Sequence, residues 1–168
     1  MSQGDPTLGG FQSFIQNQMG IPTAALDPNS QAVSDAYQTS SSWVNEQLSG
    51  IGTNQFMGGP SLYAIAVYNL GGDLIINYAQ DAANNPYIYP GSNPPTPFFQ
   101  WLRQKFKIND FLTGVVTSSS DEGTSQNLIV QEAMKTITLA DLQNLKTPYG
   151  RRYLAIAQQY GPSVWGLS

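Results

Sequence analysis

Apolar residues recur at helical spacing along most of this chain, which predicts a mainly α-helical protein. Positions three and four apart share one face of a helix, so this spacing marks segments that can bury one side. Ser, Thr or Asp precede several of these segments and Gly or Pro follow them, as at helix starts and ends. The expected helices cover residues 10–19, 30–49 and 61–81, a segment opened by Thr96 and Pro97, residues 138–146, and a last segment from Thr147 to about Gly161. In the segment at 30–49 the apolar residues with helical spacing are Val33, Ala36, Tyr37, Trp43, Val44 and Leu48.

The segment at 61–81 is apolar on nearly every side. Its apolar residues include Leu62, Ile65, Val67, Leu70, Leu74, Ile75, Ile76 and Tyr78. A helix of this kind lies at the centre of a bundle or between protomers. Gly71 and Gly72 fall in its middle, where each glycine costs about 1 kcal/mol relative to alanine. We therefore expect a close helix crossing or a kink at this point.

Two long loops carry large apolar side chains. Residues 50–60 are rich in glycine around Phe56 and Met57, and residues 82–97 are rich in proline beside Tyr87, Ile88 and Tyr89. Proline and glycine at this density rule out regular helix or strand. The aromatic residues suit contact with other protein surfaces better than a disordered linker.

One stretch suggests extended structure. Residues 114–118 and 127–130 are candidate strands around a polar turn at 119–123. The predicted fold class is therefore mainly α: a small helical bundle with long Pro/Gly-rich loops and a short β-hairpin or extended segment near 114–130. At 168 residues the chain fits one domain, expected at 1–161 and followed by a C-terminal docking tail at 162–168.

The last helix has the clearest local signals. Thr147 can cap its first turn, and Pro148 at the first helical position loses no donor that the helix needs. The residues that recur on one face are Tyr149, Tyr153, Ile156 and Tyr160. Beyond the expected helix end come Val164, Trp165 and Leu167, three large apolar side chains near the terminus. They either fold back onto their own domain or anchor in a neighbouring subunit.

Charge is scarce and unevenly distributed. Only 11% of the residues are charged, so the surface can meet other proteins with few charges to desolvate. Residues 1–102 contain six acidic residues and no Lys or Arg, whereas residues 103–168 contain seven cations and five acidic residues. The two parts therefore carry −6 and +2, a polarity that can orient copies head to tail. The net charge of −4 argues against tight binding of nucleic acid.

The chain lacks the residues on which many enzymes depend. It has no His and no Cys, which excludes Ser-His and Cys-His nucleophiles, thiolate metal sites and disulfides. Asp121 and Glu122 form a carboxylate pair without further ligands at metal-binding spacing. Glycines 58 and 59 precede a helix but have no cation nearby to help hold a phosphate. We expect no enzyme activity and no catalytic, cofactor-binding or metal-binding residues.

Two further interpretations concern nucleic acid and membranes. Arg151 and Arg152 could touch nucleic acid, but pairing with acidic neighbours is the favoured interpretation. No stretch approaches the roughly 20 apolar residues that cross a bilayer, and the N-terminus lacks the basic and apolar regions of a signal peptide. We expect a soluble protein made in the cytosol.

The order of signals in the C-terminal half resembles a known family. An extended segment containing Val116, Thr117 and Ser118 is followed by Glu122 and Gly123. A distinctive ending comes after it: Thr147, Pro148, Tyr149, Gly150, Tyr153 and Leu154. This order resembles the small head-to-tail adaptor, or connector, proteins of tailed bacteriophages, in which an early helix and a long apolar helix precede the same signals. The loop and helix between residues 81 and 113 are longer than in that pattern.

The resemblance implies a structural ring subunit of the virion. Such proteins form a dodecameric ring at the head–tail junction, docked between the portal protein and a tail terminator or another neck protein, and they are made in the host cytoplasm. DNA passes through the ring without specific binding, and no membrane is involved. The distinctive ending would pack the ring. Residues expected to bind the portal are Tyr160, Gly161, Pro162, Val164, Trp165 and Leu167. Those expected to meet tail-side or neighbouring subunits are Phe56, Met57, Tyr87, Ile88 and Tyr89.

Two other functions remain open on the sequence alone. A tail-completion or baseplate subunit would have the same neutral composition, with six-fold in place of twelve-fold copy number. A small monomeric helical module could instead use its aromatic loop to hold a ligand or peptide.

Overall fold

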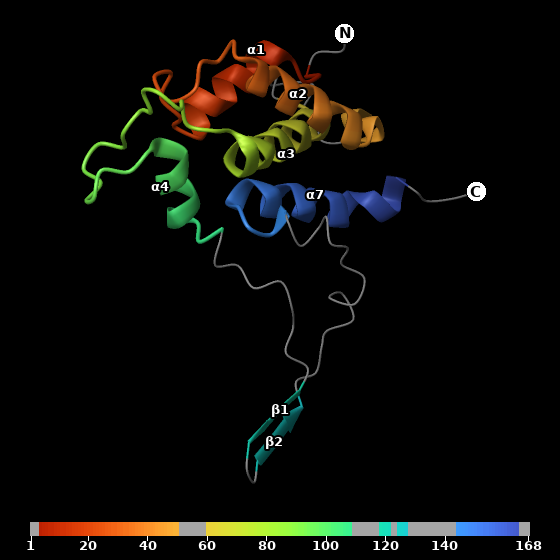
Figure 1. The fold of residues 1–168 in the computed structure, drawn as a ribbon. Helices are drawn as coiled ribbons and strands as arrows, with labels where there is room; N and C mark the ends of the chain where they lie inside the picture. The colour runs from red at the N-terminus through yellow and green to blue at the C-terminus, as the bar shows by residue number, and fades with distance from the viewer. Residues whose placement is uncertain (1–3, 51–59, 109–117, 122–123, 128–143, 165–168) are drawn as a thin grey trace.

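The computed structural model describes residues 4–50, 60–108, 118–121, 124–127 and 144–164 (Figure 1). The elements are α1 (Leu8–Ser13), the π-helical turn η1 (Phe14–Gln18), α2 (Gln31–Trp43), the 3₁₀ helix η2 (Glu46–Gly50), α3 (Leu62–Tyr78), α4 (Phe98–Lys105), β1 (Ser118–Asp121), β2 (Thr124–Asn127) and α7 (Pro148–Val164). The expected class, a small and mainly helical bundle, is confirmed. Within the described ranges, no helix is long and apolar enough to cross a membrane.

Helix α3 lies at the centre of the bundle, as its apolar sequence predicts. Helices α2 and α7 pack along it, and α4 lies at its C-terminal end (Figure 1). Its first turn is capped by Ser61, whose Oγ accepts from the amide of Ala64 at 3.1 Å and donates to the carbonyl of Gly4 at 2.7 Å. Burial extends to its polar residues Asn69 and Asp73.

The core consists of two apolar clusters that meet along α3. The larger cluster joins α1, η1, α2 and α4 to the C-terminal half of α3 and contains the buried rings of Phe11, Phe14, Phe98 and Phe99. The smaller cluster joins Val44 and Leu48 to the N-terminal half of α3, and Tyr153, Ile156 and Tyr160 of α7 pack against it. The aromatic stripe of the last helix therefore faces inward.

Gly71 and Gly72 mark a close helix crossing, one of the two explanations expected for them. A Cβ atom at Gly71 would lie 2.7 Å from the ring of Phe11, and one at Gly72 would lie 3.0 Å from the sulfur of Met19. Both distances are shorter than ordinary van der Waals contact. The paired glycines therefore let α1 and η1 approach the backbone of α3.

Two helix ends differ from expectation. Helix α2 ends at Trp43 rather than near residue 49, because Val44 is extended (φ −77°, ψ 135°). The Ser and Thr residues in its last turns contribute little helix propensity of their own. Helix α7 continues through Gly161 and Pro162 to Val164, so the predicted end near Gly161 is wrong. The φ angle of proline suits a helix, and near the C-terminus it removes only one hydrogen bond of the ladder. Residues 162–164 of the predicted tail thus belong to α7.

The start of α4 is capped from a distance. The sequence suggested Thr96 as its cap, but Pro97 occupies the cap position, and the Thr96 hydroxyl donates to the Pro94 carbonyl at 2.8 Å. The carboxylate of Asp81 accepts instead from the amides of Phe99 at 3.0 Å and Gln100 at 3.2 Å. A negative charge is favourable at this end of a helix dipole.

Strands β1 and β2 pair antiparallel, from Ser118 opposite Asn127 to Asp121 opposite Thr124. They fall within the segment expected to be extended, but their limits differ. Residues 119–121 belong to a strand rather than to the turn, because the pairing continues up to Asp121. The remaining parts of the predicted strands, most of the predicted helix at 138–146, and nearly all of the loop at 50–60 lie outside the described residues.

The glycine crossing gives a stability prediction. Gly71→Ala should destabilise the fold by about 1–3 kcal/mol, because the added methyl group must displace the buried Phe11 ring. Gly9→Ala is the matched control, since a Cβ there meets nothing within 4 Å. It should stabilise α1 by up to about 1 kcal/mol. Urea unfolding followed by circular dichroism measures both, and equal effects of the two variants would contradict the crossing.

Candidate docking surface

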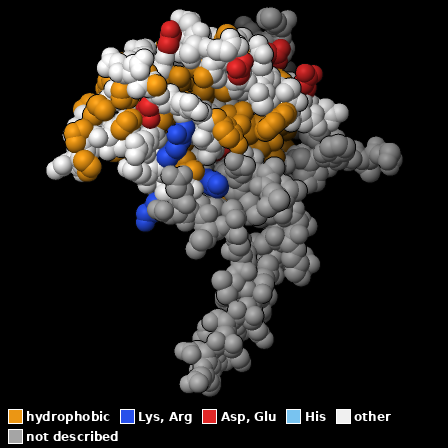
Figure 2. Space-filling view, in the orientation of Figure 1, with side chains coloured by type: hydrophobic (Ala, Val, Ile, Leu, Met, Phe, Trp, Pro, Cys, Tyr) orange, Lys and Arg blue, Asp and Glu red, His pale blue; other side chains and the backbone are white. Residues whose placement is uncertain are grey.

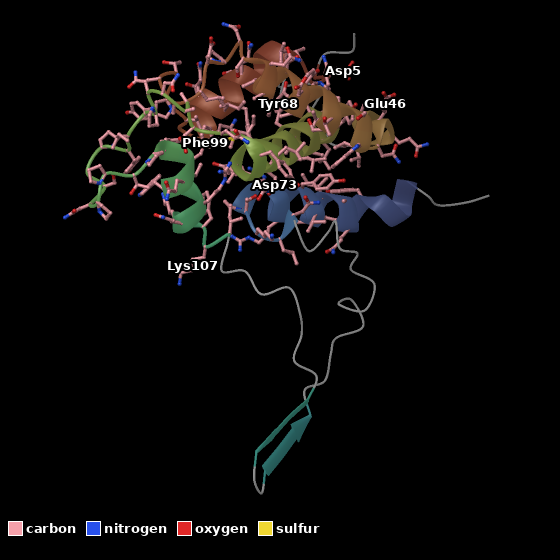
Figure 3. All side chains as sticks on the ribbon, in the orientation of Figure 1. Asp5, Glu46, Tyr68, Asp73, Phe99 and Lys107 are labelled. Atoms are coloured by element: carbon pink, nitrogen blue, oxygen red, sulfur yellow. The ribbon has the colours of Figure 1, made fainter. Side chains whose placement is uncertain are left out.

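Helix α7 is anchored to α3 by a buried hydroxyl–carboxylate pair. Thr147 and Asp73 are 0% and 1% exposed. The Thr147 hydroxyl donates to Asp73 Oδ1, and the same oxygen of Thr147 accepts from the Gly150 amide at 3.0 Å. Thr147 therefore caps α7 and links it to α3 with one side chain. Figure 3 places Asp73 between the two helices.

The surroundings of Asp73 change its acidity. Burial disfavours the charged carboxylate and raises its pKa from 3.8 to about 6. Hydrogen bonds from Thr147 and Asn77 and the charge of Lys146 act in the opposite direction. The carboxylate is thus retained at neutral pH by its partners despite an apolar environment.

Gly150 completes this junction. A Cβ atom there would lie 2.1 Å from the carbonyl oxygen of Asn144 and 2.7 Å from Asp73 Oδ1. Since one of these atoms belongs to the backbone, it cannot swing aside. The position therefore requires glycine so that α7 can approach both groups.

The residues of the distinctive ending are buried or half-buried in the structure: Thr147, Pro148, Tyr149, Gly150, Tyr153 and Leu154. Besides Thr147 and Gly150, Leu154 is buried at 6% exposure. The ring of Tyr149 meets that of Phe14 edge-on, with centroids 5.9 Å apart, and Tyr153 packs on the smaller cluster. Pro148 begins α7 and is half-buried. These residues hold α7 against its own body.

The predicted contact loops are only partly described. Phe56 and Met57 lie outside the described residues. Tyr89 stacks on Trp101 with ring centroids 3.5 Å apart, and Tyr87 packs on Phe98, so both tyrosines serve the chain's own aromatic cluster. Ile88 between them is 42% exposed.

The predicted portal-binding residues are also only partly described by the structure. Tyr160 is half-buried against the smaller cluster. Gly161, Pro162 and Val164 belong to the last turn of α7. Trp165 and Leu167 lie outside the described residues.

A groove between α2 and α3 is a feature that the sequence did not predict. It encloses about 340 Å³, and its floor is apolar, with Ala36, Leu74 and Ile75. Trp43 and Tyr78 also line it and remain 65% and 61% exposed. The sequence placed Trp43 on the inward stripe of its helix, but the buried side of α2 carries Val33, Ala36 and Ser40. Large exposed aromatic side chains beside an apolar groove are typical of a surface that another molecule covers.

The lining of this groove contains one acidic residue and no basic residue. The acidic residue is Asp35. Figure 2 shows hydrophobic side chains gathered across one face of the molecule, with most acidic side chains above them and cations below. For the described side chains on this face, the sequence polarity between residues 1–102 and 103–168 is also a polarity in space.

The residues that could suggest other chemistry remain apart. Asp121 lies in β1 and Glu122 outside the described residues. Across the ranges that the structure describes, no group of three or more acidic residues is positioned to hold a metal ion. Arg151 and Arg152 are both exposed on the first turns of α7, and Arg152 also lines a pocket with Phe14 and Tyr68. The ion pairs favoured for them are not formed among the described residues.

Comparison of the chain with protein-family models, with curated proteins and with solved structures finds no match. The arguments for its function therefore rest on its sequence pattern and on its surfaces.

The buried pair predicts a pH dependence of stability. Asp73 binds its proton more tightly in the folded chain (pKa about 6) than at its ordinary value of 3.8, so lowering the pH from 7 to 4 should stabilise the fold through this group. Relative to the Asp73→Asn variant, the gain between pH 7 and pH 4 should be about 2 kcal/mol, since most of the difference of about two pKa units is realised by pH 4.

Urea unfolding of both proteins between pH 4 and 7 measures this difference. Thr147→Ser keeps the hydroxyl and should follow the wild type, whereas Thr147→Val should lose the cap at a cost of about 1 kcal/mol or more. Parallel pH curves for the wild type and Asp73→Asn would show that the carboxyl is not perturbed.

Proposed function

We propose that this chain is a structural virion protein that forms a dodecameric ring in the neck of a tailed bacteriophage. The ring joins the portal protein to the tail and forms part of the DNA channel. The observation that carries the proposal is the ending from Thr147 to Leu154, the most specific part of the resemblance. It supports the proposal because it is a coherent structural unit, in which Thr147 and Gly150 fix α7 against the central helix.

The surface is consistent with this role. Few residues are charged, and the α2–α3 groove leaves Trp43 and Tyr78 exposed, so the chain offers apolar area to a protein partner. Twelve copies at −4 each would give a ring of about −48. Such a ring repels DNA and lets it pass without being held.

The proposed contacts with other proteins lie at two places. The C-terminal residues, including Trp165 and Leu167, insert into the portal ring. The loops with Phe56, Met57 and Ile88 face a tail terminator, another neck protein or the neighbouring subunit. The chain acts without a cofactor and without catalysing a reaction.

One observation favours a second candidate, a monomeric module that binds a small ligand or peptide. The α2–α3 groove, at about 340 Å³, falls within the range of small-molecule sites, which is roughly 300–1,000 Å³. A tail-completion or baseplate subunit with six-fold symmetry remains the alternative within the virion. The three candidates differ in copy number: twelve for the adaptor ring, one for the ligand-binding module and six for the tail-side subunit.

The first experiment mixes the protein with the portal ring of its own particle and counts bound copies by native mass spectrometry or electron microscopy. Twelve copies on one end of the portal are expected. A stable monomer that ignores the portal supports the ligand-binding module, and six-fold rings support the tail-side subunit.

Truncation then tests the docking tail. Removing residues 165–168 leaves α7 whole and should abolish or weaken portal attachment by at least tenfold, because Trp165 and Leu167 supply the apolar anchors. Removing Ser168 alone is the control and should leave attachment unchanged. Full attachment after the longer truncation would disprove a role for the tail.

A further inference from the structure

A small pocket with polar groups lies where η1, α3 and α7 meet. It encloses about 200 Å³ and shares no lining residue with the α2–α3 groove. Phe14 of η1, Tyr68 and Asn69 of α3, and Arg152 of α7 all line it. We refer to this cavity as the Asn69 pocket. Neither the stability of the bundle nor the proposed role in a virion accounts for its polar groups.

Asn69 brings an unpaired hydrogen-bond acceptor to the pocket. The residue is 1% exposed, and its Nδ2 donates to the carbonyl of Ile65 at 2.7 Å. That bond also settles which end of the amide is the oxygen, because the reverse assignment would set two oxygens against each other. Within the described part of the chain, no donor reaches Asn69 Oδ1. Buried polar atoms are normally paired, so a free acceptor beside a cavity points to a donor supplied from outside the chain.

Arg152 brings a cation to the same pocket. Its side chain is exposed, and no acidic residue among those described lines the pocket beside it. The guanidinium carries its donors in a planar fork that matches the two oxygens of a carboxylate. Arg151, although also exposed on α7, does not line the pocket. The two arginines that the sequence singled out therefore have different surroundings.

The aromatic wall of the pocket is held in place by the chain itself. The Tyr68 hydroxyl accepts from the amide of Thr7 at 3.0 Å and donates to the carbonyl of Thr7 at 3.3 Å, so the ring lies between α3 and α1 (Figure 3). A Cβ atom at Gly10 would lie 2.2 Å from the Tyr68 hydroxyl oxygen, so glycine leaves room for that group. The ring of Phe14 lies beside that of Tyr68, with centroids 5.9 Å apart. A ligand therefore meets a wall that is already formed, which lowers the entropy cost of binding.

The volume of the pocket limits the size of its ligand. Small-molecule sites usually measure roughly 300–1,000 Å³. At about 200 Å³ the Asn69 pocket is smaller, so it suits a short organic acid or one acidic residue rather than a nucleotide or a cofactor.

We propose that the Asn69 pocket binds a small carboxylate that also carries an N–H or O–H donor. The carboxylate accepts from the guanidinium of Arg152, and the donor pairs with Asn69 Oδ1. A free organic acid offers this chemistry, and so does an acidic residue of a partner chain, whose backbone amide supplies the donor. The site goes beyond the proposed ring and does not depend on it.

Three probes of similar size test both halves of this recognition. Succinamate carries a carboxylate and an amide, butyrate carries a carboxylate alone, and succinamide carries amides without a charge. Binding of each probe to the full chain is measured by saturation-transfer-difference NMR titration. Succinamate should bind at least about fivefold more tightly than either of the other two, because only succinamate satisfies both Arg152 and Asn69.

Matched variants assign the two contacts. Arg152→Gln should weaken the binding of succinamate at least about fivefold, whereas Arg151→Gln removes the same charge outside the pocket and should leave binding unchanged. Asn69→Leu removes the acceptor, so it should reduce the affinity for succinamate to that for butyrate without changing the affinity for butyrate. Circular dichroism checks that each variant is folded. If Asn69→Leu does not fold, the arginine pair and the comparison of probes still decide.

A fourth probe, N-acetyl-aspartate N-methylamide, distinguishes the two sources of the ligand. Binding of succinamate, with or without this probe, supports a site for free acids, and binding of the aspartate probe alone supports a site for an acidic residue of a partner chain. The proposal is overturned if succinamate and butyrate bind equally and the aspartate probe does not bind. Equal effects of the two arginine variants also overturn it, as does the absence of binding by both acids at about 20 mM, where a site with a Kd near 1 mM would be almost full.

Discussion

The fold depends on one turn of α3, where three successive residues each receive a different element. Gly71 admits the ring of Phe11, Gly72 admits Met19, and Asp73 receives the hydroxyl of Thr147. The first two contacts are steric and need the absence of a side chain, whereas the third is polar and needs a carboxylate. A substitution at any of the three would therefore displace a different element of the bundle.

This arrangement also explains why a groove remains. A helix that is apolar on all sides must be covered on all sides to be stable in water. The turn at 71–73 commits two sides of α3 to the chain's own elements, and α2 covers a third side only in part. Leu74, Ile75 and Tyr78 consequently line an open groove. Part of the apolar surface of α3 is thus left uncovered by its own chain in this groove.

The sequence predicted those features that depend on neighbouring residues. The cap at Thr147 and the inward stripe of Tyr153 and Ile156 are local patterns, and both are found where they were expected. The cap of α4 could not be predicted in this way, because Asp81 lies 18 positions before the amide of Phe99 that it accepts from. Trp43 was assigned to the buried side of α2, since aromatic residues at helical spacing usually mark a core. Only the packing of α2 on α3 decides which of its apolar residues are left outside.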